Sequence, residues 1–189
     1  SPIILIINRG KYTMIAKRLW LVLPIILLFG CSQRNETKCT MESLLLTCAN
    51  YPGGCVEDEA SSPLPEEPNR SAARYLYRGK TPAHHVVIEY PSLKRAEQRF
   101  DDYQQAIFEN SDPSLEEFPI TFTNITADEM RCGCTRNEER KVCSFIARYE
   151  KIVTFINVDV SDSGFSIHDF HNSISDIEDK VSACYLEDH

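Results

Sequence analysis

Eight cysteines lie among the 189 residues of this chain, and they constrain its fold more than any other feature. A cytosolic protein of this size seldom carries so many, because thiols are kept reduced in that compartment. The count therefore indicates an oxidising compartment and a fold that disulfide bridges help to hold together. The length suits one domain of ordinary size with tails, or two very small domains.

The N-terminal region has the layout of a secretory signal. An apolar run of 11 residues, Leu19 to Phe29, directly follows the basic pair Lys17 and Arg18. At ~1.5 Å per residue, such a run is too short to cross the ~30 Å hydrocarbon core of a bilayer as a helix. We therefore expect upstream sequence at 1–13, with Met14 as the start, and an export signal over 14–30.

The apolar run ends in Leu28-Phe29-Gly30-Cys31, which resembles the lipobox of bacterial lipoproteins. The resemblance implies a diacylglyceryl group on the sulfur of Cys31, cleavage between Gly30 and Cys31, and acylation of the new amino group, typically with palmitate. Glycine admits a peptidase close to the backbone, and a thiol is a strong nucleophile for the alkylation. Phe29 departs from the small or aliphatic residue usual at its position. We expect a lipid-anchored protein on the extracytoplasmic side of a cell membrane.

Two other interpretations of the N-terminal region stay open. In the first, the chain has a plain secretory peptide and Cys31 follows it by chance. In the second, the protein is eukaryotic and carries N-linked sugars, because three sequons begin at Asn35, Asn69 and Asn124.

The charge balance argues against one class of partner. The chain has 20 Lys+Arg and 28 Asp+Glu, and four of the basic residues and none of the acidic ones lie in the first 31 positions. Removing that segment leaves 16 basic and 28 acidic residues, a net charge of -12. Such a surface repels phosphate backbones, so we expect no nucleic-acid binding.

The exported part is predicted to divide into a tether and one domain. Residues 31–70 are predicted to be the lipid anchor followed by an acidic tether rich in proline and serine. Within it, Cys48 and Cys55 flank a Tyr51–Gly54 turn, and either a small disulfide-closed loop or a pair of incidental thiols fits the pattern. Residues 71–189 are predicted to form a single α+β extracytoplasmic domain.

Hydrophobic periodicity predicts the elements of that domain. Apolar residues at helical spacing predict a helix over 93–107 and another over 167–184, the second capped by Ser166 with Asp169. Strands are predicted at 84–89, 119–126, 128–135, 141–149 and 152–160. We expect an antiparallel sheet with the two helices packed on one face, and a disulfide-containing hairpin. Residues 127–184, with Ala147-Arg148-Tyr149, also resemble bacterial lipoproteins of uncharacterised function, a resemblance that implies no activity.

Three cysteines lie in the predicted hairpin. A turn centred on residues 137–138 places Cys132 opposite Cys143, and a shift of one residue places Cys134 there instead. We expect a Cys134–Cys143 disulfide. The alternative is a redox pair or soft-metal site at Cys132 and Cys134, with nearby arginines (Arg131, Arg136, Arg140) lowering a thiol pKa. Cys184 is expected to be a buried thiol or to reach a sheet cysteine.

No motif for catalysis, metal binding or a cofactor stands out in the chain. His168 and His171 lie at the edge of the last apolar stripe, and His84 and His85 alternate faces of one strand. Two functions stay open. The first is a non-enzymatic module that binds an envelope protein, a cell-wall component or a small ligand. The second is a lipid-anchored thiol-redox or metal-binding protein that uses Cys132 and Cys134.

Overall fold

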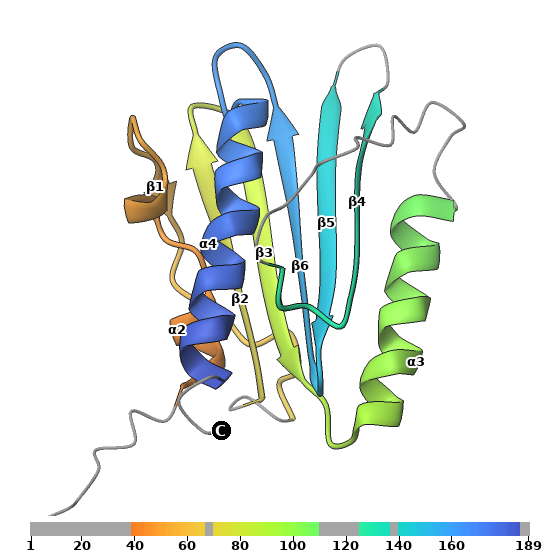
Figure 1. The fold of residues 1–189 in the computed structure, drawn as a ribbon. Coiled ribbons are helices and arrows are strands. Elements are labelled where there is room, and N and C mark those ends of the chain that lie inside the picture. Colours follow the sequence, from red (N-terminus) through yellow and green to blue (C-terminus); the bar gives the residue numbers. More distant parts are fainter. Residues whose placement is uncertain (1–38, 67–69, 110–124, 137–139, 186–189) are drawn as a thin grey trace, which may run out of the picture. The chain divides into compact units, whose positions relative to one another are not determined.

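Six antiparallel strands form a single sheet, in the spatial order β1-β2-β3-β6-β5-β4 (Figure 1). The computed structural model describes residues 39–66, 70–109, 125–136 and 140–185. The strands are β1 (Val56–Glu57), β2 (Ser71–Arg78), β3 (Thr81–Glu89), β4 (Glu129–Arg136), β5 (Lys141–Tyr149) and β6 (Ile152–Val160). Because β3 pairs with β6, the first and second halves of the sheet meet along these two central strands.

Five helical segments accompany the sheet in the described part of the chain. They are α2 (Met41–Leu44), the 3₁₀ turn η1 (Cys48–Asn50), α3 (Leu93–Gln104), its π-helical extension η3 (Gln105–Glu109) and α4 (Ile167–Tyr185). The predicted cap of the last helix is confirmed. The Ser166 N–H donates to Asp169 Oδ2 at 2.7 Å, and the Asp169 N–H donates to Ser166 Oγ at 3.1 Å.

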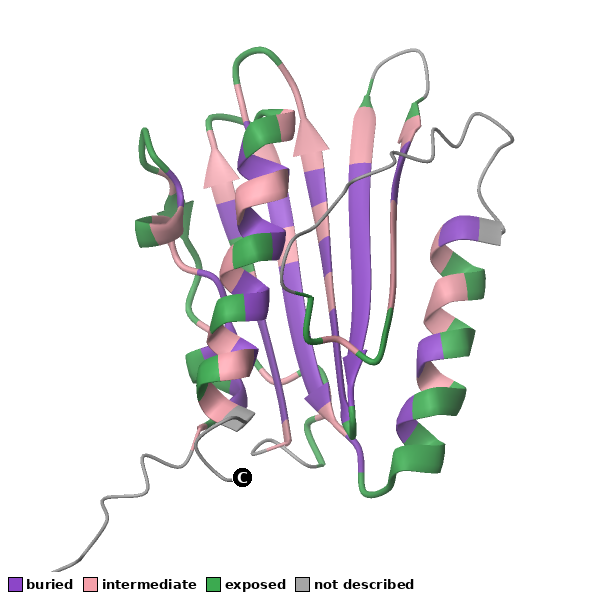
Figure 2. Ribbon diagram, viewed as in Figure 1, coloured by how far each residue is buried: buried purple, intermediate pink, exposed green. Residues whose placement is uncertain are grey.

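Both faces of the sheet are buried, and each is covered by a different helix. α3 packs over Ala73, Val86, Ile88, Ile146 and Val153, whereas α4 packs over the residues of opposite parity, among them Val87, Phe145 and Ile156. Figure 2 shows buried residues along much of β3 and β5, with a buried stripe on each long helix. The antiparallel sheet with packed helices and the α+β class are therefore confirmed.

The prediction that the two long helices share one face is wrong. Successive residues of a strand point to opposite faces, so a continuous apolar run needs a cover on both sides. Val86-Val87-Ile88 and Phe145-Ile146-Ala147 are such runs, and all six residues are at most 3% exposed. A one-sided sandwich would have left half of these side chains in water.

The segment predicted to be a tether belongs to the folded unit from residue 39 onward. Leu44, Leu45 and Leu46 are at most 1% exposed within the α4-side core, and β1 pairs with β2. Burying three leucine side chains contributes several kcal/mol, which is enough to order a short segment. The predicted tether is therefore wrong for residues 39–66, and β2 is a strand that the periodicity did not reveal.

Several predictions lie outside the described residues. They concern the export signal at 14–30, the lipobox residues Gly30 and Cys31, and most of the strand predicted at 119–126. Among the helices of the described part, none combines the length and the apolar character that crossing a membrane requires.

Candidate functional site

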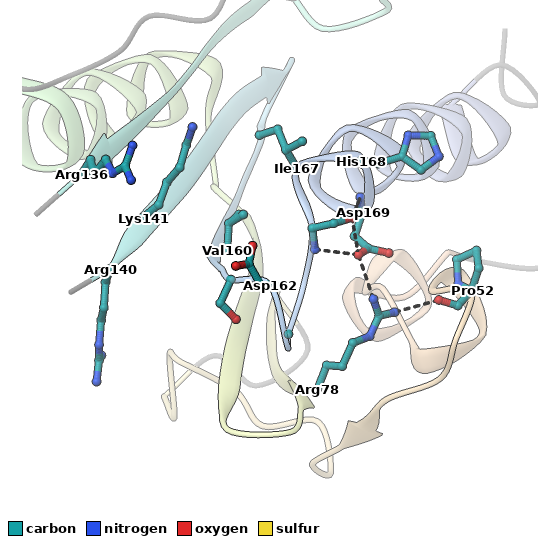
Figure 3. Close-up of a pocket in the computed structure, with 13 residues that line it drawn as sticks. Pro52, Arg78, Arg136, Arg140, Lys141, Val160, Asp162, Ile167, His168 and Asp169 are labelled. Carbon is teal, nitrogen blue, oxygen red and sulfur yellow. Dashed lines mark hydrogen bonds and ion pairs between the residues drawn. The ribbon is translucent and has the colours of Figure 1, made fainter. Parts of the chain in front are cut away.

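A cavity of about 960 Å³ lies where α4 begins (Figure 3). Four parts of the chain form its walls: the loop before β1, the end of β2, the facing ends of β4 and β5, and the segment from β6 into α4. The lining residues are Pro52, Arg78, Arg136, Arg140, Lys141, Val160, Ser161, Asp162, Gly164, Ser166, Ile167, His168 and Asp169. Its size is typical of a pocket for a small molecule.

Among the described residues of this lining, basic side chains outnumber carboxylates. Arg136, Arg140 and Lys141 come from the ends of β4 and β5, and the fourth cation, Arg78, ends β2 on the other side of the cavity (Figure 3). Two carboxylates, Asp162 and Asp169, belong to the β6–α4 segment. Arg140 also lies 4.0 Å from a third carboxylate, Asp159, on β6.

Arg78 forms part of one wall of the cavity, and its own hydrogen bonds fix it there. Its Nε donates to Gly54 O at 3.0 Å, its Nη2 to Pro52 O at 3.0 Å, and its Nη1 to Asp169 Oδ2 at 2.8 Å. The guanidinium also lies over the Phe165 ring, 5.0 Å from its centroid. One planar fork thus joins the loop that precedes β1 to the first turn of α4.

Asp169 is fixed by the same contacts. Burial alone would raise the pKa of this carboxyl, but hydrogen bonds from Ser166 and the charge of Arg78 outweigh burial and lower the pKa below its usual range. The carboxylate is therefore ionised at neutral pH and occupied by the helix cap and by Arg78.

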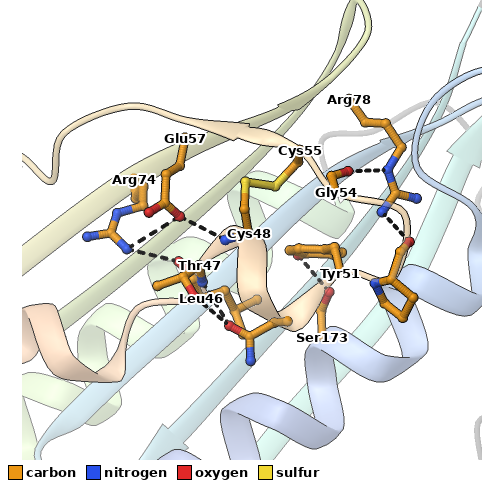
Figure 4. The surroundings of a disulfide bond; sticks show 12 residues. Leu46, Thr47, Cys48, Tyr51, Gly54, Cys55, Glu57, Arg74, Arg78 and Ser173 are labelled. Carbon is orange, nitrogen blue, oxygen red and sulfur yellow. Dashed lines mark hydrogen bonds and ion pairs between the residues drawn. A yellow bond between two sulfur atoms is a disulfide. The ribbon is translucent and has the colours of Figure 1, made fainter.

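The disulfide Cys48–Cys55 closes the loop that Arg78 holds (Figure 4). Tyr51, inside this loop, is 3% exposed, and its hydroxyl lies 2.8 Å from Ser173 Oγ on α4. Burial raises the pKa of Tyr51 to about 12. On the other side of the loop, Glu57 accepts from the Cys48 N–H at 2.8 Å. These contacts hold Pro52 in place at the rim of the cavity.

Three disulfides join six cysteines of the described part. One of them is the expected Cys134–Cys143 bridge, and another is the Cys48–Cys55 bridge, one of the two interpretations left open for that loop. Cys48–Cys55 and Cys134–Cys143 are confirmed, and the register Cys134↔Cys143 shows why the latter forms. Cys143 lies opposite Cys134 in the hairpin, so the pair Cys132/Cys134 proposed for redox chemistry is not the bonded one. Cys132 is half-buried on β4.

The third bridge, Cys39–Cys184, was missed. Its cysteines are 145 residues apart, so no local pattern connects them. Cys184 was expected to be a buried thiol or to reach a sheet cysteine, and both expectations are wrong. The apolar stripe of α4 placed it correctly on the core side, but its partner comes from the segment thought to be a tether.

The histidines take separate structural places. His84 stacks on Tyr75, with ring centroids 4.1 Å apart, on the α3 side of the sheet, and His168 lines the cavity. His85 is fully buried on the other side, which confirms that the pair alternates faces. In the described residues, no group of three or more His, Cys, Asp or Glu side chains is arranged to hold a metal ion.

The three arginines expected to lie beside the predicted thiol pair divide between two other places in the structure. The Arg131 guanidinium lies 4.8 Å from the centroid of the Phe108 ring in η3. Arg136 and Arg140 line the cavity, so the structure brings them to a different site from the one expected.

Comparison of the chain with protein-family models, curated proteins and solved structures finds no match.

Proposed function

We propose that this protein is exported, anchored by lipid on Cys31 to the extracytoplasmic side of a membrane, and binds a ligand in the cavity at the start of α4. The observation that carries the proposal is the set of three disulfides within residues 39–184. Disulfides persist in oxidising compartments, so three of them support export. The signal-like segment and lipobox in the sequence agree with this destination.

The position of Cys39 limits the distance between a lipid on Cys31 and the start of the domain. Cys31 precedes Cys39 by eight residues, and Cys39 is bonded to Cys184 near the end of α4. Eight residues span at most ~28 Å even when fully extended. The tether would therefore be far shorter than the 40 residues that the composition indicated. The domain would then lie close to the membrane surface.

The residue types and contacts of the cavity lining favour binding over catalysis. The thirteen described lining residues include no cysteine, and one of their two carboxylates, Asp169, is held by Ser166 and Arg78. The buried His85–Thr154 pair, 2.8 Å apart, lies inside the core and does not line the cavity. A rigid rim with charged walls is suited to recognising a ligand.

Cell fractionation of the Cys31→Ser variant tests the anchor. The native chain should be found in the membrane fraction and should incorporate labelled fatty acid. Cys31→Ser should lose the label and leave that fraction. Cys132→Ser is the matched control, because it removes a thiol that belongs neither to the lipobox nor to the three bridges.

If Cys31→Ser stays in the membrane with its N-terminal segment uncut, the protein is held by an uncleaved signal and the proposal fails. If the native chain is secreted and carries no lipid, the plain secretory interpretation is correct. N-linked sugar on the native chain would instead support the eukaryotic interpretation and overturn the lipoprotein assignment.

A further inference from the structure

We infer that the end of the domain at which α3 begins docks on anionic headgroups of the membrane that holds the Cys31 lipid. The docking surface, called the anchor-end surface below, consists of Leu93, Lys94, Arg95 and Lys151. All four residues are exposed. This docking goes beyond the ligand binding proposed above, and it rests on the lipid anchor of that proposal.

The anchor enters the domain at this end of the sheet. Cys39 lines one cavity together with the start of β2 and with Glu89 at the end of β3. Ile152, the first residue of β6, pairs with Glu89. The carbonyl of the preceding residue, Lys151, accepts from the Tyr90 N–H at 2.8 Å. Figure 1 shows the start of α3 and the last turn of α4 at this same end. A chain that leads from the lipid into Cys39 therefore reaches the domain beside the anchor-end surface.

The length of the tether favours contact by this end. The eight residue steps from Cys31 to Cys39 span at most ~28 Å. From Ile167 to Cys184, α4 alone rises 17 steps of ~1.5 Å, or ~26 Å. The far end of the domain reaches the membrane only when the tether is almost fully extended, whereas the anchor end does so in any conformation of the tether. Because the lipid keeps the surface near the membrane, even a weak contact is populated. Docking by this end leaves the cavity at the start of α4 away from the membrane.

Leu93 is the first residue of the apolar stripe of α3. It is 46% exposed, whereas Ala96 and Phe100 in the same stripe are at most 3% exposed. One exposed leucine is ordinary on a soluble protein, so its position carries the argument. Figure 2 shows an exposed first turn of α3, at the end of the molecule where the anchor enters. An apolar side chain at this place gains free energy by entering the boundary between headgroups and acyl chains.

Three cations accompany this leucine. Lys94 and Arg95 follow it in the first turn of α3, and Lys151 lies in the turn between β5 and β6. Neither Lys94 nor Lys151 forms an ion pair with a carboxylate of the described residues, whereas Arg99, one turn along α3, pairs with Asp102 at 3.3 Å. The helix dipole disfavours cations in a first turn, so the helix itself does not account for them. Headgroup phosphates would be favourable partners for these cations.

The carboxylates at this end differ in how they affect docking. Glu89 is paired with Arg70 at 3.7 Å. Glu150, in the turn between β5 and β6, is exposed and opposes docking. Residues 67–69 and 186–189 lie outside the described residues. Docking is therefore expected from an apolar residue with cations beside it, whatever the net charge of this end, and each charge can be tested separately.

A tryptophan probe tests the docking. The chain has one tryptophan, Trp20, which precedes Cys31, so the mature chain has none. Leu93→Trp therefore places a single reporter in the anchor-end surface. Val56→Trp is the matched control, because Val56 is 69% exposed and lies in β1, which pairs with the far end of β2.

Both variants are made in the mature chain with Cys132→Ser, which removes the other thiol outside the three bridges, and Cys31 is coupled to a maleimide lipid in vesicles. This coupling supplies the anchor whether or not the cell attaches a lipid, so the docking and the lipoprotein assignment fail separately. With anionic headgroups, the emission of Leu93→Trp should move to shorter wavelength and be quenched by brominated lipid. The emission of Val56→Trp should do neither.

Charge variants of the tryptophan-bearing chain measure the contribution of the headgroups. Lys151→Gln should lower the ratio of docked to undocked chains about fivefold, and Lys94→Gln should do the same. Lys80→Gln is the matched control, since it removes an exposed lysine from the turn between β2 and β3 at the other end of the sheet. It should leave the ratio unchanged. Glu150→Gln should raise the ratio.

Four results would overturn the docking. The first is that anionic vesicles leave the emission of Leu93→Trp unchanged. The second is a shift of Val56→Trp instead, which would mean contact by the other end. The third is an equal shift of Leu93→Trp in neutral and in anionic vesicles, which would remove the role given to the headgroups. The fourth is equal weakening by Lys151→Gln and Lys80→Gln, which reports net charge alone.

Discussion

Acidification should destabilise this protein through one buried histidine, His85. Its Nδ1 accepts the Leu46 N–H at 3.0 Å, and its Nε2 lies 2.8 Å from Thr154 Oγ1. The Thr154 hydroxyl donates to Val86 O at 3.1 Å, so it accepts from Nε2–H. Both ring nitrogens are therefore satisfied only in the neutral Nε2–H form. A proton added at Nδ1 would point at the Leu46 N–H, so this hydrogen bond would be lost.

The magnitude follows from the pKa of His85, which burial lowers from 6.5 to about 3, with smaller contributions from the charges of Lys180, His84 and Arg74. A folded pKa below the unfolded one means that unfolding takes up a proton. The stabilisation is therefore present above pH 6.5 and is lost as the pH falls towards 3. The slope in between is ~1.4 kcal/mol per pH unit, so lowering the pH from 7 to 5 costs about 2 kcal/mol.

Urea unfolding at pH 7, 6 and 5 with the disulfides intact measures this loss. The variant His85→Gln keeps an acceptor and a donor but does not titrate, so it isolates the contribution of His85. Its free energy of unfolding, subtracted from that of the native chain, should leave a difference that falls by about 2 kcal/mol between pH 7 and 5. His84→Gln, at the half-buried neighbour on the other face, should remove much less of the slope. A difference that stays constant with pH would refute the assignment of His85 as a neutral core residue.

Three further predictions concern the packing around the cavity and the N-terminal segment. Gly164→Ala should lower the free energy of unfolding by about 2 kcal/mol, because a Cβ there would overlap the Thr81 side chain, and Thr81→Gly should restore part of the loss in a double-mutant cycle. Replacing Cys39 and Cys184 together by alanine opens a loop of 145 residues and should cost about 4–5 kcal/mol in urea unfolding; a loss below 1 kcal/mol would contradict the role given to this bridge. Arg78→Lys should cost about 2 kcal/mol and speed proteolysis of the loop before β1, since one ammonium cannot reproduce the three hydrogen bonds of the guanidinium.

Local patterns in the sequence account for much of the fold. The strand Ile152–Val160 and the helix Ile167–Tyr185 follow from runs of apolar residues at period 2 and at helical spacing, and the Ser166 cap follows from its partner three residues later. The bridges Cys48–Cys55 and Cys134–Cys143 span 7 and 9 residues, short enough for a turn or a hairpin register to bring their cysteines together.

The sequence patterns do not predict the cavity, although several of its lining residues take part in other predictions. Arg136 and Arg140 were noted only for their nearness to Cys132 and Cys134, and His168 only as part of a helix flank. The site exists because the far end of the β4–β5 hairpin, the end of β2 and the start of α4 meet at one edge of the molecule. No spacing between residues along the chain predicts that these segments lie side by side.

The sequence by itself determined where the two long helices and the strands β3, β4, β5 and β6 form, and which nearby cysteines are candidates for bridges, because these depend on contacts between residues close along the chain. Only the tertiary structure decided that residues 39–66 belong to the domain, that Cys39 bonds to Cys184, and that the two long helices cover opposite faces. Each of these depends on packing between distant segments. The eight cysteines that first constrained the fold indicated that bridges would hold it together, and the topology decided that one bridge joins the start of the domain to its last helix.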